Sequence, residues 1–227
     1  MIRPTKLEEV FQMSHYTVAV FTHTEDEVDE LLAPFNEVVE PGSPYAEFNE
    51  HEDADVDPVT GKKGYWYNPN ARWDWYSVGG RWAGQLKLKN AEGAGNGIEC
   101  CDTARVRDCD FSPDEEDYRE AIRCWEIAVE GSPMTEEERK KYVLMYKGEY
   151  YIQQYGTKEN YARQISDFST YAFITAEGKW HETGRMGWFG MDDATRSSRE
   201  TYRKAFDAYL EEARKQDLLI TIVDCHI

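Results

Sequence analysis

The sequence predicts an α+β fold in a single domain, and three observations lead to it. Residues 15–22 and 217–227 are both rich in β-branched and aromatic side chains, which is typical of buried strands. A predicted helix follows the first segment, and another precedes the last. A ferredoxin-like antiparallel sheet begins and ends in this way, with its first and last strands adjacent. The chain between them then forms a large helical and loop insertion.

Turn and capping signals define the elements of the first half. Thr24 and Glu27 have the spacing of a capping box, which predicts a short helix that ends before Pro34. Residues 35–64 are rich in proline, glycine and acidic side chains, so we expect an excursion from the domain. The alternation of residues 84–90 predicts a strand.

The second half carries three helix signals and one hairpin. Residues 112–131 begin with Ser-Pro and repeat apolar side chains at helical spacing, and Thr135 with Glu138 forms another capping box. Residues 169–184 predict two short strands about an Ala-Glu-Gly turn. Residues 194–216 are the longest amphipathic pattern and lead into the last strand. We therefore expect one α+β domain with no internal repeat.

Composition bounds the class of protein. The chain has 227 residues and no long uncharged apolar window, so no membrane span is predicted. Its five cysteines lack paired CxxC spacing, which favours reduced thiols over a zinc site or a disulfide framework. We expect residues 13–227 to form the domain and residues 1–12 an N-terminal extension, with Met13 as an alternative start. The expected location is the cytoplasm, with no cofactor and no metal.

The charge is strongly negative, with 44 acidic and 26 basic residues and a net charge of −18. Such a surface repels phosphate backbones, so we expect no binding to duplex nucleic acid. Simple solubility is one interpretation of the charge. Mimicry of nucleic-acid charge, which would block proteins that bind DNA, is the other. A homo-oligomer is compatible with either.

The stretch YNPNARWDWYSVGGRWAG is unusually rich in aromatic, arginine and glycine residues. If its centre is extended, Trp73 and Trp75 point to one side, and Arg72, Asp74 and Tyr76 to the other. In one interpretation the tryptophans belong to the core, with Arg72 and Asp74 paired outside. In the other, the aromatic and arginine side chains bind a ligand.

The glycines favour the ligand interpretation. Gly79 and Gly80 allow the backbone to bend or to approach another group closely, and Arg81 can bind a carboxylate or phosphate. A planar anionic ligand needs an aromatic face, a guanidinium and an unobstructed backbone. A second loop, GRMGW, repeats these residue types. The predicted ligand-binding residues are Arg72, Trp73, Trp75, Tyr76, Arg81, Arg185 and Trp188.

A second candidate site lies at the two ends of the chain. If the terminal strands are antiparallel neighbours, His15 lies near His226, with Thr17 and Asp224 on the same face. Two such histidines can act as general acid and base on a phosphodiester, which makes His15, Thr17 and His226 the candidate catalytic residues. His15 and His181 also begin His-x-Thr patterns, as in two-histidine phosphoesterases. The alternative is a histidine that merely caps a sheet edge.

Four motifs carry a resemblance to a known family: MSHYTV, YNPNARWDWYSVGGRW, GKWHETGRMGW and DLLITIVDCHI. With these motifs the chain resembles a family of proteins found in bacteriophages, prophages and their hosts. The resemblance implies that the protein acts in a phage-infected or prophage-bearing cell, and it implies no particular reaction or ligand. The family usually has tyrosine where this chain has His181, which argues against a catalytic role for that histidine.

Three functions follow as hypotheses. The first is a binding protein that captures a small anionic, nucleotide-like ligand and so sequesters a host immune signal in the host cytoplasm. The second is a phosphodiesterase that uses His15 and His226. The third is an acidic inhibitor or DNA mimic that binds a host defence protein. Binding without turnover separates the first from the second, and co-purification with a host protein identifies the third.

Overall fold

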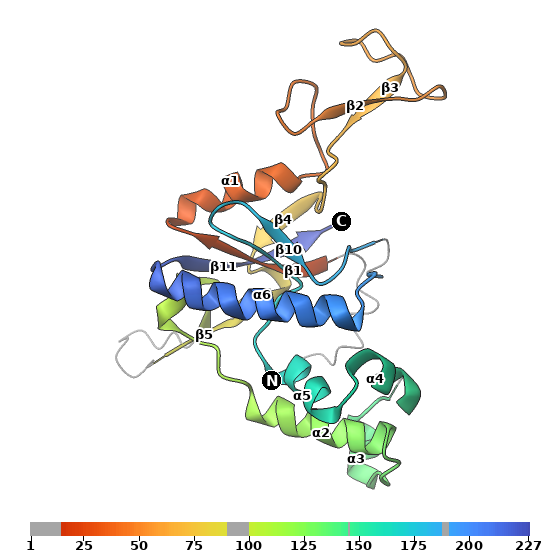
Figure 1. The fold of residues 1–227 in the computed structure, drawn as a ribbon, viewed down its shortest axis with the longest axis vertical. Coiled ribbons are helices and arrows are strands. Elements are labelled where there is room, and N and C mark those ends of the chain that lie inside the picture. The colour runs from red at the N-terminus through yellow and green to blue at the C-terminus, as the bar shows by residue number, and fades with distance from the viewer. Residues whose placement is uncertain (1–14, 90–99, 145, 188–190) are drawn as a thin grey trace.

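A mixed sheet forms the centre of the molecule (Figure 1). The computed structural model describes residues 15–89, 100–144, 146–187 and 191–227, so the expected N-terminal extension lies outside the described residues. The strand order is β10-β9-β1-β11-β4, and β7 pairs with β11 beside β4. The strands are β1 (His15–Thr22), β4 (Trp75–Val78), β7 (Thr103–Arg105), β9 (Ala172–Ile174), β10 (Trp180–Glu182) and β11 (Leu219–His226).

The two terminal strands are adjacent, as the sequence predicted. β1 and β11 are antiparallel and pair from His15 opposite His226 to Thr22 opposite Leu219. Both lie inside the sheet, and nearly all their side chains are buried. The expectation of a fully antiparallel sheet is wrong at one place, because β1 and β9 run parallel. A crossover connection leads from β1 to β9, and such a connection produces parallel neighbours.

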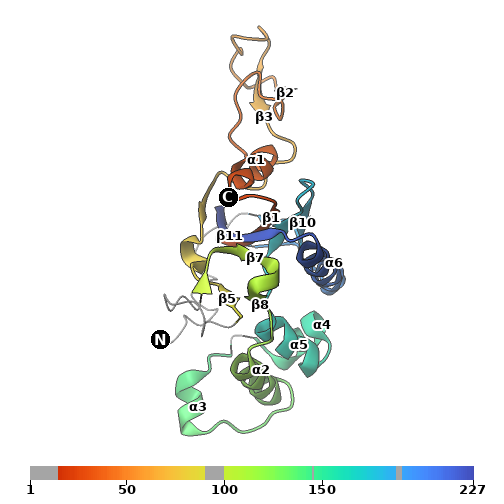
Figure 2. The ribbon, with the colours of Figure 1, turned by 90° about the vertical axis from the view of Figure 1, so that its left-hand side faces the viewer.

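Helices cover both faces of the sheet. α6 (Arg196–Lys215) packs Tyr202, Phe206 and Leu210 against one face, while α1 (Val28–Leu32) packs Val28 and Leu32 against the other. Figures 1 and 2 show the sheet between these two helices. An α+β sheet of the expected ferredoxin-like kind keeps its helices on one face. The class is α+β as predicted, but the arrangement has three layers.

Four helices form a separate group beside the sheet: α2 (Glu115–Ala128), α3 (Glu136–Lys141), α4 (Gly148–Tyr155) and α5 (Lys158–Ser166). The Asp114 side chain caps α2 by accepting two backbone N–H groups, and the predicted capping box of Thr135 and Glu138 begins α3. Trp125, Tyr151 and Tyr161 form the aromatic centre of the group. These helices are the main part of the expected insertion.

Smaller sheets and turns complete the fold. β2 (Glu47–Glu50) and β3 (Gly64–Tyr67) form a two-stranded arm that projects from the body in Figures 1 and 2. A three-stranded sheet consists of β5 (Leu86–Leu88), β6 (Cys100–Cys101) and β8 (Cys109–Asp110). The described part of the chain also contains the 3-10 helices Glu25–Glu27, Ala33–Phe35, Gly80–Trp82 and Val106–Asp108. Among the described helices, none has the length and apolarity needed to cross a membrane.

Candidate functional site

Two histidines meet where β1 begins and β11 ends. His15 and His226 are direct partners in the antiparallel register, and their ring centroids lie 4.9 Å apart at an interplanar angle of 71°. Because alternate residues share a face, Thr17 and Asp224 lie on the same side of the sheet as the histidines. The strand pairing expected from the sequence thus brings together the residues of the second candidate site.

A carboxylate holds each histidine. Nδ1 of His15 lies 2.7 Å from Oδ1 of Asp224, and Nδ1 of His226 lies 2.7 Å from Oδ1 of Asp74. A carboxylate at Nδ1 fixes the tautomer and orientation of an imidazole and leaves Nε2 to exchange protons. Among the described residues, neither Nε2 has a hydrogen-bond partner. The site therefore contains two adjacent His-Asp dyads.

The two dyads differ in their exposure. The side chains of His15 and Asp224 are 9% and 3% exposed, whereas those of His226 and Asp74 are 29% and 35% exposed. The second oxygen of Asp224 accepts the backbone N–H of Arg81 at 3.0 Å. Asp224 of the inner dyad thus binds both His15 and the Arg81 backbone, whereas the outer dyad is more exposed to solvent.

Trp75 extends the site with an exposed aromatic ring. Its ring stacks on His226 at a centroid distance of 5.6 Å and contacts the edge of His15 at 5.2 Å. The residue is 45% exposed although it lies on a strand of the central sheet. The three rings form a triangle, with an exposed tryptophan beside two proton carriers.

The two glycines of the aromatic stretch allow the backbone to reach the inner dyad. Gly79 and Gly80 have φ of +71° and +49°, and a Cβ on Gly80 would lie 2.4 Å from Cβ of Asp224. A Cβ on Gly79 would lie 2.4 Å from the carboxylate of Asp102. The predicted close approach is confirmed, and the groups approached are two carboxylates of the protein itself. The backbone N–H of Arg81 is thereby placed to donate to the Asp224 carboxylate.

The tryptophans of this stretch do not share one side, so that expectation is wrong. Trp73 is 6% exposed, packs against the α1 side of the sheet, and donates its Nε1–H to the Leu32 carbonyl at 3.2 Å. Tyr76 packs edge-on against Trp73, and its hydroxyl donates to Asp29. β4 begins only at Trp75, so the extended alternation assumed for the whole segment does not apply before that residue.

Two further candidates serve the packing of the sheet. Arg72 forms an ion pair with Glu182 at 3.2 Å rather than with Asp74, and its carbonyl accepts the hydroxyl of Tyr16. The Thr17 hydroxyl accepts the backbone N–H of Tyr171 at 3.1 Å. Through these contacts both residues position strands near the dyads.

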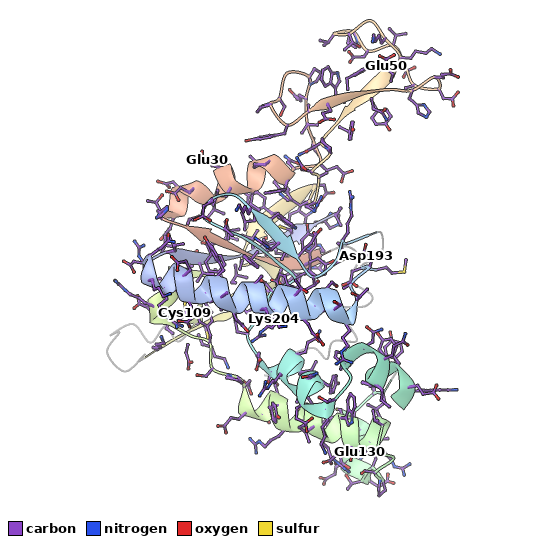
Figure 3. All side chains as sticks on the ribbon, viewed as in Figure 1. Glu30, Glu50, Cys109, Glu130, Asp193 and Lys204 are labelled. Carbon is purple, nitrogen blue, oxygen red and sulfur yellow. The ribbon has the colours of Figure 1, made fainter. Side chains whose placement is uncertain are left out.

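The second glycine loop stays a prediction. Arg185 is exposed and its backbone N–H donates to Asp193, which Figure 3 labels, at 2.6 Å. Trp188 lies outside the described residues. The expected pocket lined by Arg81, Arg185 and Trp188 is therefore neither supported nor contradicted.

Two other reactive side chains belong to the packing. His181 on β10 stacks on Phe173 at 4.5 Å, and burial lowers its pKa. Cys225 faces the α1 side, and burial raises the pKa of its thiol well above the usual value. Neither is placed to act with the dyads. In the described part of the chain, no group of three or more His, Cys, Asp or Glu side chains is arranged to hold a metal ion.

Sequence reasoning missed the role of Asp74. The sequence interpretation placed this carboxylate on the protein surface, paired with Arg72. It did not connect Asp74 with His226, which is 152 residues away in the sequence. A polar residue between two tryptophans was the available signal, but only the pairing of β4 with β11 shows which histidine it reaches.

No family model, curated protein or solved structure matches the chain.

Proposed function

We propose that the protein cleaves a phosphodiester bond in a small nucleotide-like substrate, with His15 and His226 as general acid and base. One observation carries the proposal: two imidazole rings lie 4.9 Å apart, each held at Nδ1 by its own carboxylate. Such a pair can contact two oxygens of one phosphate group. Phosphodiester cleavage needs one proton removed and one proton supplied at such oxygens.

The dyads define the roles of the residues. One ring, neutral, accepts the proton of the attacking hydroxyl, and the other, protonated, donates a proton to the leaving oxygen. Asp224 and Asp74 orient the rings through Nδ1, so that Nε2 of each is the nitrogen that faces the substrate. Positioned acid–base groups of this kind contribute about 10²–10⁴-fold each to a rate.

Charge and exposure favour a small substrate. A net charge of −18 opposes the approach of a long polyanion, whereas a ligand with one or two phosphates meets less repulsion. The exposed ring of Trp75 offers a stacking surface for a nucleobase beside the histidines. In the phage setting that the sequence resemblance implies, cleavage would remove a host signalling nucleotide rather than sequester it.

The test is turnover of defined nucleotides by wild type and matched variants. We would incubate the protein with 3′,5′-cyclic mononucleotides, dinucleoside monophosphates and cyclic dinucleotides, and separate the products by chromatography with mass detection. His15→Gln and His226→Gln should each reduce the rate at least about 100-fold. His23→Gln is the control, because this exposed histidine follows the other end of the same strand.

Two outcomes would contradict the proposal. If wild type cleaves none of these nucleotides, the dyads are not a phosphodiesterase site. Stoichiometric binding without product would instead support capture, the function first predicted from the sequence. If both histidine variants cleave at the wild-type rate while folded, as circular dichroism would show, the activity belongs to another site.

A further inference from the structure

We infer that the substrate supplies its own nucleophile, and that the protein acts on 3′,5′-phosphodiesters with a free 2′-hydroxyl. This inference rests on the proposed function and names its substrate class. The observation behind it is that the described residues place two proton carriers at the site and no activated protein nucleophile beside them.

Among the described residues, no hydroxyl or thiol near the dyads forms a hydrogen bond with a histidine ring. The Thr17 hydroxyl accepts the Tyr171 N–H, and the Cys225 thiol is fully buried on the opposite face. Ser77 pairs with Asp224 in the sheet, but among the described residues its hydroxyl has no hydrogen bond to either histidine. A serine or cysteine nucleophile needs a base within hydrogen-bond reach, and none of these side chains has one.

A vicinal hydroxyl is the nucleophile that acid–base chemistry alone can use best. Well-oriented intramolecular nucleophiles reach effective molarities of about 10⁵–10⁸ M. A site that uses such a nucleophile therefore does not need to bind and orient a water molecule for attack on the phosphorus. The 2′-hydroxyl of a ribonucleotide is such a group. The two histidines then need only to remove the proton of the 2′-hydroxyl and to supply a proton to the leaving oxygen.

The step balances in atoms and protons. One histidine Nε2 takes the proton of the 2′-hydroxyl as the O2′–P bond forms, and the P–O5′ bond breaks. The leaving O5′ receives the proton of the other histidine. The products are a 2′,3′-cyclic phosphate and a free 5′-hydroxyl, and solvent exchange restores the two rings.

Trp75 places the base next to the reacting ribose. Its ring contacts both His15 and His226, so a base stacked on its exposed part brings the attached ribose to the dyads. Trp75→Ala should therefore raise KM about tenfold, with a smaller effect on kcat. Tyr65→Ala is the matched control, because Tyr65 is a comparably exposed aromatic residue on the distant arm.

The experiment compares three probes that differ only at the 2′ position: adenylyl-3′,5′-adenosine, its deoxy analogue and its 2′-O-methyl analogue. We expect wild type to cleave only the first and to release adenosine 2′,3′-cyclic phosphate. In ¹⁸O-enriched water this initial product should carry no label, because no water enters the step. His226→Gln should abolish its formation, and His23→Gln should not.

The outcomes separate this inference from the proposed function. Cleavage of the deoxy or methylated probe, or ¹⁸O in the first product, would overturn the inference and leave the phosphodiesterase in place. Failure on all three probes with turnover of another nucleotide lacking a free 2′-hydroxyl would do the same. Failure on every phosphodiester tested would overturn the proposed function itself.

Discussion

Replacing Trp73 by alanine should destabilise the protein strongly, whereas the same change at Trp75 should not. The two tryptophans are two residues apart, yet Trp73 is 6% exposed and Trp75 is 45% exposed. Trp73 fills the space between α1 and the sheet, and its Nε1–H satisfies the carbonyl of Leu32. Trp75 packs on the histidines from one side only.

The magnitude follows from the buried area. A tryptophan buries about 150–250 Å², which at about 25 cal/mol per Å² corresponds to roughly 4–6 kcal/mol as an upper bound. Truncations of buried tryptophan cost about 3–5 kcal/mol, and the Leu32 carbonyl would also lose its partner. We therefore expect about 4 kcal/mol for Trp73→Ala and about 2 kcal/mol for Trp75→Ala, which loses roughly half as much area and creates no internal cavity.

The assay is urea unfolding followed by far-UV circular dichroism, because each variant removes a tryptophan and fluorescence would change for that reason alone. A loss of about 4 kcal/mol lowers the midpoint by more than about 1 M. Equal losses in the two variants would refute the assignment of Trp73 to the core and Trp75 to the surface.

Two further predictions concern the dyads' support and the pH dependence of stability. Gly80→Ala should lower the free energy of unfolding by at least about 1 kcal/mol more than Gly131→Ala does. Both glycines have positive φ, but only at Gly80 would the new Cβ collide with Asp224. Equal losses of stability in urea unfolding would contradict this. Burial lowers the pKa of His181, so the unfolded state binds its proton more tightly and stability falls as pH drops through the ordinary value near 6.5. His181→Phe should therefore lose less stability than wild type between about pH 7.5 and 5.5, measured by thermal unfolding, and an unchanged difference would exclude His181 as the cause.

The pairing of the histidines could be predicted from the sequence because it depends on a simple rule. Two hydrophobic segments at the ends of the chain, each joined to a helix, pair as antiparallel neighbours, and their first and last residues then meet. His15 and His226 stand at those positions. The face shared with Thr17 and Asp224 follows from the period of two in a strand.

The rest of the site could not be predicted, because it depends on where β4 begins and which strand it joins. The alternation rule, applied to residues 72–76 as one strand, put Trp73 and Trp75 together and Asp74 outside. In the structure β4 begins only at Trp75, and Trp73 packs on the α1 side while Asp74 binds His226. Neither the order of strands around the long insertions nor the parallel pairing of β1 with β9 leaves a local signal.

The long separation of the dyad partners has a consequence for folding. The His15–Asp224 and His226–Asp74 hydrogen bonds close loops of 209 and 152 residues along the chain. Contacts of such sequence separation form late, after the cost of loop closure has been met by other parts of the fold. The two His-Asp dyads therefore form only when the whole sheet is assembled, and a chain whose terminal strands are not yet paired does not contain them.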